Sequence, residues 1–342
     1  MTENKRYDSG VRKTPLAEEI STAGLRAQYD MHAKRLLSAR PILARILQKT
    51  VAECAAFTIE QIMEQIEPDV LISEEPVEPA AEKTWITGDD TVSQLAGEGT
   101  VTYDIRFHLQ LPALGSGQGK GVRLLFDLEA QKEFYMNYRL VTRGIYYTAR
   151  MISSQKNREF TGSEYAKLKK VYSIWICMNA PQYIGNALTE YRIIKEDRDN
   201  FMPEAETSYD KLSVILICLN EKQSRGQAGS LYHFLNTLLS SVLTPEEKES
   251  ILEKDYGISM ETKIRKEMEA MCNLSEAIEE RGIERGMKLG MEQGMEQGME
   301  LGSFITLSSL VKDGLLRTDE AAKRMNMSEK EFADRMKEEK EK

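Results

Sequence analysis

The chain has 342 residues, of which 41% are hydrophobic and 30% are charged, and its formal net charge is −9 at pH 7. This size and composition allow one large domain or a few modules with a buried core. The acidic balance argues against a general nucleic-acid coat protein. The four cysteines form no C-x-x-C pair and the three histidines are scattered, so the spacing excludes the usual zinc sites.

Helices are predicted first along the chain, after a polar tail at residues 1–25. Residues 26–66 carry apolar residues at three- and four-residue spacing, and Pro41 marks a helix start or a break. Residues 67–100 are acidic and rich in turn formers, which predicts a loop or an insertion.

Two strands are predicted next, at 100–111 and 122–131, and the Gly-rich connection PALGSGQGKG suits an antiparallel hairpin between them. A helix at 138–155 follows, and then buried strands at 170–179 and 211–220. This order predicts a mixed α/β sheet, placed in a domain at 26–228. The remainder, 229–342, has helical patterns.

No apolar run is long enough to span a bilayer. The N-terminal sequence MTENKRYDSGVRK lacks the apolar core of a signal peptide. We therefore expect a cytoplasmic protein with reduced thiols and no membrane partner.

The strand LLFDLEAQ, residues 124–131, has an unusual polar face. Alternation places Leu, Phe, Leu and Ala on one side, and Asp127, Glu129 and Gln131 on the other. The two predicted strands are symmetric about their connection, which brings Asp104 opposite Glu129. Two opposed carboxylates repel each other, and Mg²⁺ or Mn²⁺ would compensate them because hard cations prefer carboxylate oxygens.

Asp104 together with DLEAQ resembles the PD-(D/E)XK nuclease pattern. With the following YRLVTRGIYYTARMISSQ and the C-terminal Gly repeat, it resembles the recombination-promoting nuclease/putative transposase family of bacteria. The resemblance implies a restriction-endonuclease-like mixed sheet core flanked by helices, with a helical C-terminal extension. It also implies metal-dependent hydrolysis of DNA, in recombination or in a mobile element.

Carried over by position, Asp104 and Glu129 would bind the metal. Gln131 would replace the lysine that orients the attacking water, although it brings no positive charge. Asp30 is the first candidate for the family's upstream acid and Glu53 the second. Asp127 has a supporting role.

Three arginines follow on the predicted helix. Arg139, Arg143 and Arg150 share one stripe and could grip DNA phosphates, or they could form an ordinary solvated face. The acids likewise have a plainer interpretation, as the solvated outer face of an antiparallel sheet. The alternative function is a catalytically silent DNA-binding or oligomeric assembly protein that keeps the nuclease fold.

The segment 282–302 has a glycine every fourth residue, six in all. Each glycine costs a helix about 0.5–1 kcal/mol relative to alanine, so the repeat needs a reason. One interpretation is a helix that packs closely on a second copy, with methionines as adaptable contacts. The other is a flexible tether. We favour the helix and expect a homo-oligomer through it.

Overall fold

The structure is a computed structural model that describes residues 15–67, 71–72, 92–95, 99–112, 122–131, 134 and 137–338. Most of the predicted loop at 67–100, residues 113–121 of the connection and residues 1–14 of the polar tail lie outside these residues. The prediction of a tail is wrong for residues 15–25, which belong to a helix that begins at Pro15. Contacts divide the chain into two compact units, Met1–Glu276 and Ala277–Lys342. The first unit therefore extends beyond the boundary at residue 228 that the sequence suggested.

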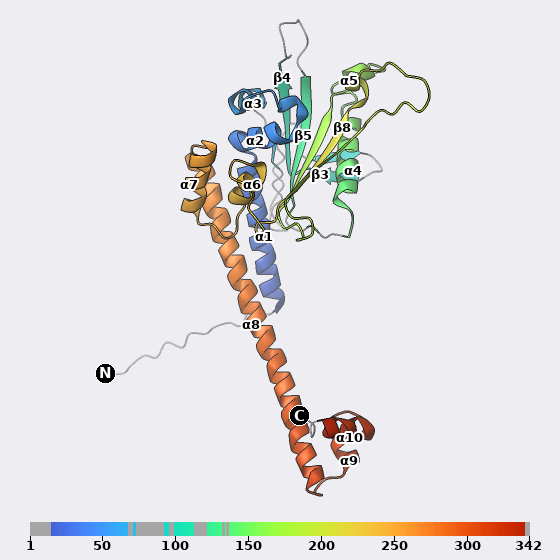
Figure 1. Cartoon of the computed structure of the whole chain (residues 1–342), viewed down its shortest axis with the longest axis vertical. Helices are drawn as coiled ribbons and strands as arrows, with labels where there is room; N and C mark the ends of the chain where they lie inside the picture. The colour runs from blue at the N-terminus through green and yellow to red at the C-terminus, as the bar shows by residue number, and fades with distance from the viewer. Residues whose placement is uncertain are drawn as a thin grey trace, which may run out of the picture. The chain divides into compact units, whose positions relative to one another are not determined.

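A mixed β-sheet forms the centre of the first unit (Figure 1). Its strands lie in the order β1 (Leu71–Ile72), β4 (Ile105–Leu111), β5 (Val122–Gln131), β6 (Val171–Cys177), β8 (Leu212–Cys218), β7 (Ala187–Arg192). The neighbours β5, β6 and β8 are parallel, whereas β4 and β7 pair antiparallel to the strands beside them. The predicted α/β class with a mixed sheet is confirmed.

Helices cover both faces of this sheet (Figure 1). The helix predicted after the second strand is α4 (Leu140–Ser153), and it packs on β6 and β8 through an apolar cluster that includes Tyr147, Met151, Trp175 and Val214. The helices before the sheet are α1 (Pro15–Leu37), α2 (Arg40–Thr50) and α3 (Ile59–Gln65). The short helix α5 (Glu206–Tyr209) lies between β7 and β8, and α6 (Leu231–Leu238) and α7 (Pro245–Tyr256) follow the last strand.

The face of the sheet opposite α4 carries a row of stacked aromatic rings. The ring centroids of Phe107 and Phe126 are 4.9 Å apart, and those of Phe126 and Tyr172 are 5.1 Å apart. All three rings are buried. Because strand residues alternate between faces, the odd-numbered residues of β5 and β6 point towards α4 instead.

The predicted strand at 100–111 is in fact two strands. Residues Gly99–Thr102 form β3, which pairs with β2 (Val92–Leu95) in a separate two-stranded sheet. The chain leaves that sheet at Tyr103 and Asp104, and β4 begins at Ile105. Asp104 therefore lies immediately before a strand and not within one.

The second unit contains most of α8 (Thr262–Lys312), followed by α9 (Thr318–Arg324) and α10 (Glu329–Glu338). Phe304, Ala321, Ala322 and Phe332 form its small core. The six repeat glycines are helical, as favoured above, and α9 and α10 agree with the helical patterns predicted for 229–342. Within the described part of the chain, no helix is long and apolar enough to cross a membrane.

Gly144 tests how closely α4 lies on the sheet. A Cβ atom at this position would lie 2.5 Å from Cγ1 of Val214 and 3.1 Å from Nε1 of Trp175. We predict that Gly144→Ala lowers the free energy of unfolding by about 1–3 kcal/mol through overpacking, although alanine is the better helix former. Chemical denaturation measures the change.

Gly24→Ala in α1 is the matched control, because no described atom lies within 4 Å of a Cβ there. This variant should be neutral or more stable by up to about 1 kcal/mol. Equal effects of the two substitutions would contradict the close packing of α4.

Candidate active site

Asp104 and Glu129 meet where β4 begins. Ile105 pairs with Leu128, so the register brings Asp104 next to Glu129, as the symmetry of the two strands predicted. The backbone N–H of Asp104 donates to Oε1 of Glu129 over 3.0 Å. In return, the backbone N–H of Ala130 donates to Oδ2 of Asp104 over 3.1 Å. These reciprocal bonds hold the two carboxyl groups beside each other.

The acidic face of β5 is buried beneath α4. Asp127 is 0% exposed and Glu129 is 4% exposed, so the plainer interpretation of a solvated outer face is wrong. The indole N–H of Trp175 donates to Oγ of Ser173 over 2.8 Å, and that hydroxyl donates to Oδ2 of Asp127 over 2.8 Å. Asp127 is thus an integral part of the site, and its Oδ1 has no hydrogen-bond partner.

Burial changes the acidity of both carboxyl groups. Desolvation raises the pKa of Asp127 to about 7, although hydrogen bonds from Glu129 and Ser173 act the other way. Desolvation also raises the pKa of Glu129 well above its usual range, and the nearby charges of Asp127 and Asp104 add to the effect. Near neutral pH the pair therefore retains protons unless a cation compensates its charge.

Lys34 of α1 is the residue that the sequence interpretation missed. Its Nζ lies 2.8 Å from Oδ1 of Asp104 and 2.9 Å from Oδ2 of Asp30. Desolvation opposes the charge on Lys34, but attraction to Asp104 and Asp30 outweighs it and raises the pKa of the ammonium group. Asp30, the first candidate for the upstream acid, is therefore joined to the site through Lys34. The spacing of Asp30 and Lys34, four residues apart on a helix, was the available signal.

Glu53, the second candidate, lies elsewhere. It accepts a hydrogen bond from the hydroxyl of Tyr172, and Nζ of Lys170 is 3.1 Å from its Oε1. Tyr172 points to the face of the sheet opposite Ser173 and Trp175. Glu53 therefore does not share the site of Asp104 and Glu129.

Gln131 is the last residue of β5 and is half-buried. It follows Glu129 by two positions, so both side chains project from the same face of the strand. Its carbonyl accepts a hydrogen bond from the backbone N–H of Met178 over 2.9 Å, which fixes the end of the strand.

The three arginines do not form one exposed stripe. Arg150 is only 2% exposed, so its predicted place on a solvent-facing stripe is wrong. The guanidinium of Arg143 lies over the rings of Tyr138, Tyr147 and Trp175, and its Nε donates to the Tyr147 hydroxyl over 3.0 Å. Arg139 is exposed at the start of α4. The guanidinium groups of Arg143 and Arg150 both lie near aromatic rings of their own helix, so these side chains also contribute to packing.

Two carboxylates suit a magnesium or manganese ion, since Mg²⁺ commonly takes one or two protein carboxylates and keeps several waters. Asp104 and Glu129 provide that pair, and the unpartnered oxygen of Asp127 lies on the same face. Among the described residues, however, no group of three or more His, Cys, Asp or Glu side chains has the geometry to hold a metal ion. A bound ion would therefore depend on water and on substrate oxygens for its remaining ligands.

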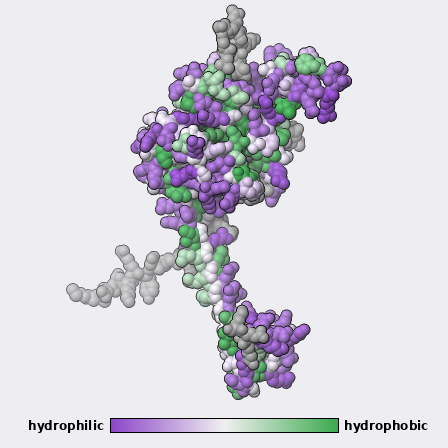
Figure 2. All heavy atoms as spheres, viewed as in Figure 1, coloured by the Kyte–Doolittle hydropathy of each residue, from purple (hydrophilic) through white to green (hydrophobic). Residues whose placement is uncertain are grey.

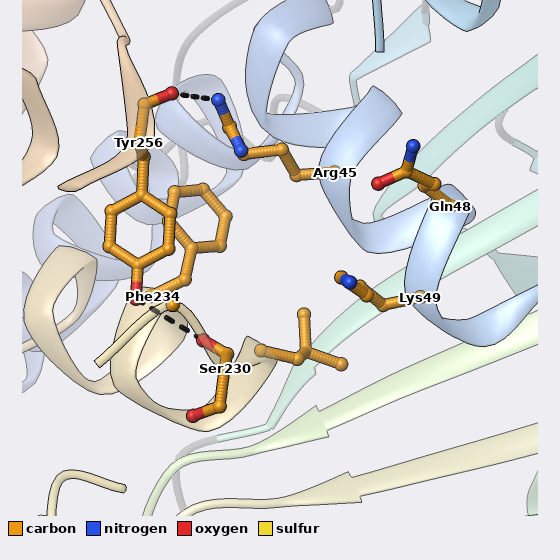
Figure 3. Close-up of a pocket in the computed structure, with 8 residues that line it drawn as sticks. Arg45, Gln48, Lys49, Ser230, Phe234 and Tyr256 are labelled. Carbon is orange, nitrogen blue, oxygen red and sulfur yellow. Dashed lines mark hydrogen bonds between the residues drawn. The ribbon is translucent and has the colours of Figure 1, made fainter. Parts of the chain in front are cut away.

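A separate small pocket lies between α2, α6 and the end of α7 (Figure 3). Arg45, Lys49, Phe234 and Tyr256 help to line it, and the Tyr256 hydroxyl donates to the carbonyl of Ser230 over 3.2 Å. Its cavity volume is about 30 Å³. No carboxylate is among the residues that line this pocket, so it does not share the chemistry of the Asp104–Glu129 site.

Comparisons with known protein families, with curated proteins and with solved structures give no match for this chain.

Asp127→Asn tests the buried acid pair in the presence of EDTA. The unfolded chain loses the Asp127 proton near pH 4, whereas the folded chain keeps it to about pH 7. Unfolding therefore releases a proton in this window, and the free energy of unfolding of the parent falls as the pH rises from 4 to 7. Asparagine cannot ionise, so the variant should gain stability relative to the parent by on the order of 1–4 kcal/mol across the window.

Denaturant titrations at several pH values measure this difference. Asp197→Asn is the control, because the pKa of this exposed carboxyl is lowered, chiefly by a hydrogen bond from Lys195. A stability difference between Asp127→Asn and the parent that does not change with pH would show that Asp127 is already ionised when folded.

Proposed function

We propose that this chain is a metal-dependent endonuclease that hydrolyses phosphodiester bonds in DNA, and that its first unit is a restriction-endonuclease-like PD-(D/E)XK domain. The observation that carries the proposal is the reciprocal hydrogen bonding of Asp104 with Glu129 and Ala130. It holds Asp104, just before β4, beside Glu129 of β5, with Gln131 two residues further on. The resemblance to the recombination-promoting nuclease/putative transposase family suggests a role in recombination or in a mobile element.

Asp104 and Glu129 would hold Mg²⁺ or Mn²⁺. When bound, the ion would polarise a phosphoryl oxygen and lower the pKa of a water molecule. The amide of Gln131 can orient that water by hydrogen bonds but cannot balance negative charge. Lys34 brings a positive charge to Asp104 from α1, 2.8 Å away. The amide of Gln131 and the ammonium group of Lys34 therefore come from different elements, β5 and α1.

Exposed Arg139 and the neighbouring Arg143 are the candidates for contact with DNA phosphates. Guanidinium groups suit phosphate because their planar fork donates two hydrogen bonds at once. Arg150 is excluded from this role by its burial.

The alternative is a catalytically silent DNA-binding or assembly protein that retains the nuclease fold. One observation favours it: Lys34 forms an ion pair with Asp104 that can neutralise this carboxylate. In this alternative the ion pair would replace the metal site and stabilise the contact of α1 with the sheet.

Asp104→Asn and Glu129→Gln separate the two functions. If the acids bind a catalytic ion, each variant should lower plasmid nicking in Mg²⁺ or Mn²⁺ by at least about 100-fold, since removing a single group that stabilises a transition state typically costs that much. For Glu129→Gln the melting temperature should stay the same or rise, because repulsion between the acids is relieved. For Asp104→Asn this gain is offset by the loss of the ion pair with Lys34.

Glu164→Gln is the control, because Glu164 is an exposed carboxyl paired only with its neighbours in sequence. The parent and this control should nick DNA with metal and not with EDTA. Equal nicking by all four proteins would reject the site, and metal-independent DNA binding without nicking would support the alternative.

We also propose that α8 associates with a second copy through its Gly repeat. No described atom lies within 4 Å of a Cβ built on any of the six glycines. The methionines beside them are 61–68% exposed, and Figure 2 shows apolar and near-neutral residues along this helix. These four methionines are Met287, Met291, Met295 and Met299.

Gly290→Leu should lower the average mass in light scattering, because a large side chain prevents close approach of the helices. Glu292→Leu, two residues away and on the opposite side of the helix, is the control and should leave the mass unchanged. A Gly290→Leu variant with the same mass as the parent would mean that the repeat is only a helical connection.

A further inference from the structure

The edge strand β7 is unusually exposed. It pairs only with β8 among the described strands and ends the sheet. All of its residues except Ala187 are exposed, including Leu188 at 41% and Tyr191 at 40%. Ile193 and Ile194 continue the chain at 43% and 72% exposure. Natural edge strands are usually protected by proline, by bulges or by covering segments, because their free backbone groups can pair with another chain.

The sequence of β7 offers little of that protection. Ala187–Arg192 contains no proline, and Thr189 and Tyr191 are good strand formers. In Figure 1 the chain between β7 and α5 projects away from the sheet as a loop and does not fold over the strand. This loop carries further exposed apolar side chains, with Phe201 at 75% and Met202 at 64%.

The strand is complementary to itself when two copies run antiparallel with Tyr191 opposite Tyr191. In that register Glu190 faces Arg192 of the second copy, and by symmetry the same pair occurs twice. Leu188 faces Ile194, and Thr189 faces Ile193. Opposite charges and apolar pairs at directly opposed positions each stabilise an antiparallel sheet.

Neighbouring registers are poorer. A two-fold axis at residue 190 would oppose Glu190 to itself and Leu188 to Arg192. An axis at residue 192 would oppose Arg192 to itself and Glu190 to Ile194. Registers with the two-fold axis between residues 190 and 191, or between 191 and 192, place no opposite charges together. Like charges directly opposed are destabilising, so charge alone selects Tyr191 as the centre.

Both charged groups can reach a second copy from their present positions. Glu190 accepts a hydrogen bond from Ser213 over 2.8 Å, and Arg192 lies 3.2 Å from Glu206. The Arg192 side chain remains 44% exposed in this ion pair. An arginine has five N–H donors and a carboxylate accepts several hydrogen bonds, so these contacts leave capacity for a partner.

We propose that two copies of this chain associate through β7, antiparallel and centred on Tyr191, and join their sheets into one continuous sheet. This interface goes beyond the proposed nuclease activity and does not depend on it. It is also separate from the contact proposed for α8, because it involves only the first unit.

A disulfide tests the register. In the proposed dimer residue 191 lies beside its own copy, within the Cα separation of about 4.4–6.8 Å that a disulfide spans. Tyr191→Cys should therefore form a covalent dimer under mild oxidation. Thr189→Cys, on the same face of β7, is the matched control: its two copies would lie about 14 Å apart, beyond disulfide reach.

We expect covalent dimer from Tyr191→Cys at least ten times faster than from Thr189→Cys, and efficient cross-linking when Thr189→Cys and Ile193→Cys are combined. Tyr191→Cys should cross-link equally in the Gly290→Leu background, which separates this interface from α8. Faster cross-linking of Thr189→Cys alone, or equal rates for the two single variants, would overturn the proposal.

Charge exchange is the second test, measured by sedimentation of the full chain in the Gly290→Leu background, which serves as the parent here and removes the proposed α8 contact. Glu190→Arg and Arg192→Glu each oppose like charges twice in the dimer, so each should weaken association by at least tenfold. The double variant restores both pairs and should associate within a few-fold of the parent. A parent that is monomeric at 100 µM, or a double variant as weak as the single variants in proteins of equal melting temperature, would overturn the proposal.

Discussion

The reciprocal hydrogen bonds between Asp104 and the Glu129–Ala130 segment are the constraint on which the site depends. They lie where the chain leaves one small sheet and enters another, so the side chain of Asp104 takes over backbone bonding that a strand would otherwise provide. The bonds place two acids together in spite of their repulsion. Three features of the site compensate this negative charge: protonation of the buried carboxyl groups, the ion pair of Asp104 with Lys34, and the proposed metal ion.

Charge compensation links three elements of the first unit. Isolated buried carboxylates are costly, and proteins relieve them by protonation, by ion pairing or by metal binding. Here Asp127 and Glu129 lie under α4 with raised pKa values, whereas Asp104 is paired with Lys34 from α1. A metal ion that displaced Lys34 from Asp104 would leave the Lys34 ammonium group available to bind a phosphate of the proposed DNA substrate. The same ion would draw protons from the buried pair, so metal affinity and pH are coupled.

The sequence predicted the local parts of this arrangement well. The alternation in β5 and the symmetry about its connection were sufficient to place Asp104 beside Glu129, because register across a hairpin depends on neighbouring residues. Lys34 was missed because its contact with Asp104 is long-range, and its four-residue spacing from Asp30 shows only that these two residues share a face of α1. Arg150 was misplaced because helical spacing shows which residues share a face but not whether another element covers that face. The exposed strand β7 was missed because it lacks the apolar alternation of a half-buried strand.

The central claim is that Asp104 and Glu129 together hold a divalent cation, and a crystal structure with Mn²⁺ tests it most directly through the anomalous signal of the ion. The account predicts a peak between the two side chains, at about 2.1–2.2 Å from one oxygen of each, with Nζ of Lys34 moved away from Asp104. A structure at millimolar Mn²⁺ that shows no peak there, with Lys34 still bound to Asp104, would contradict it.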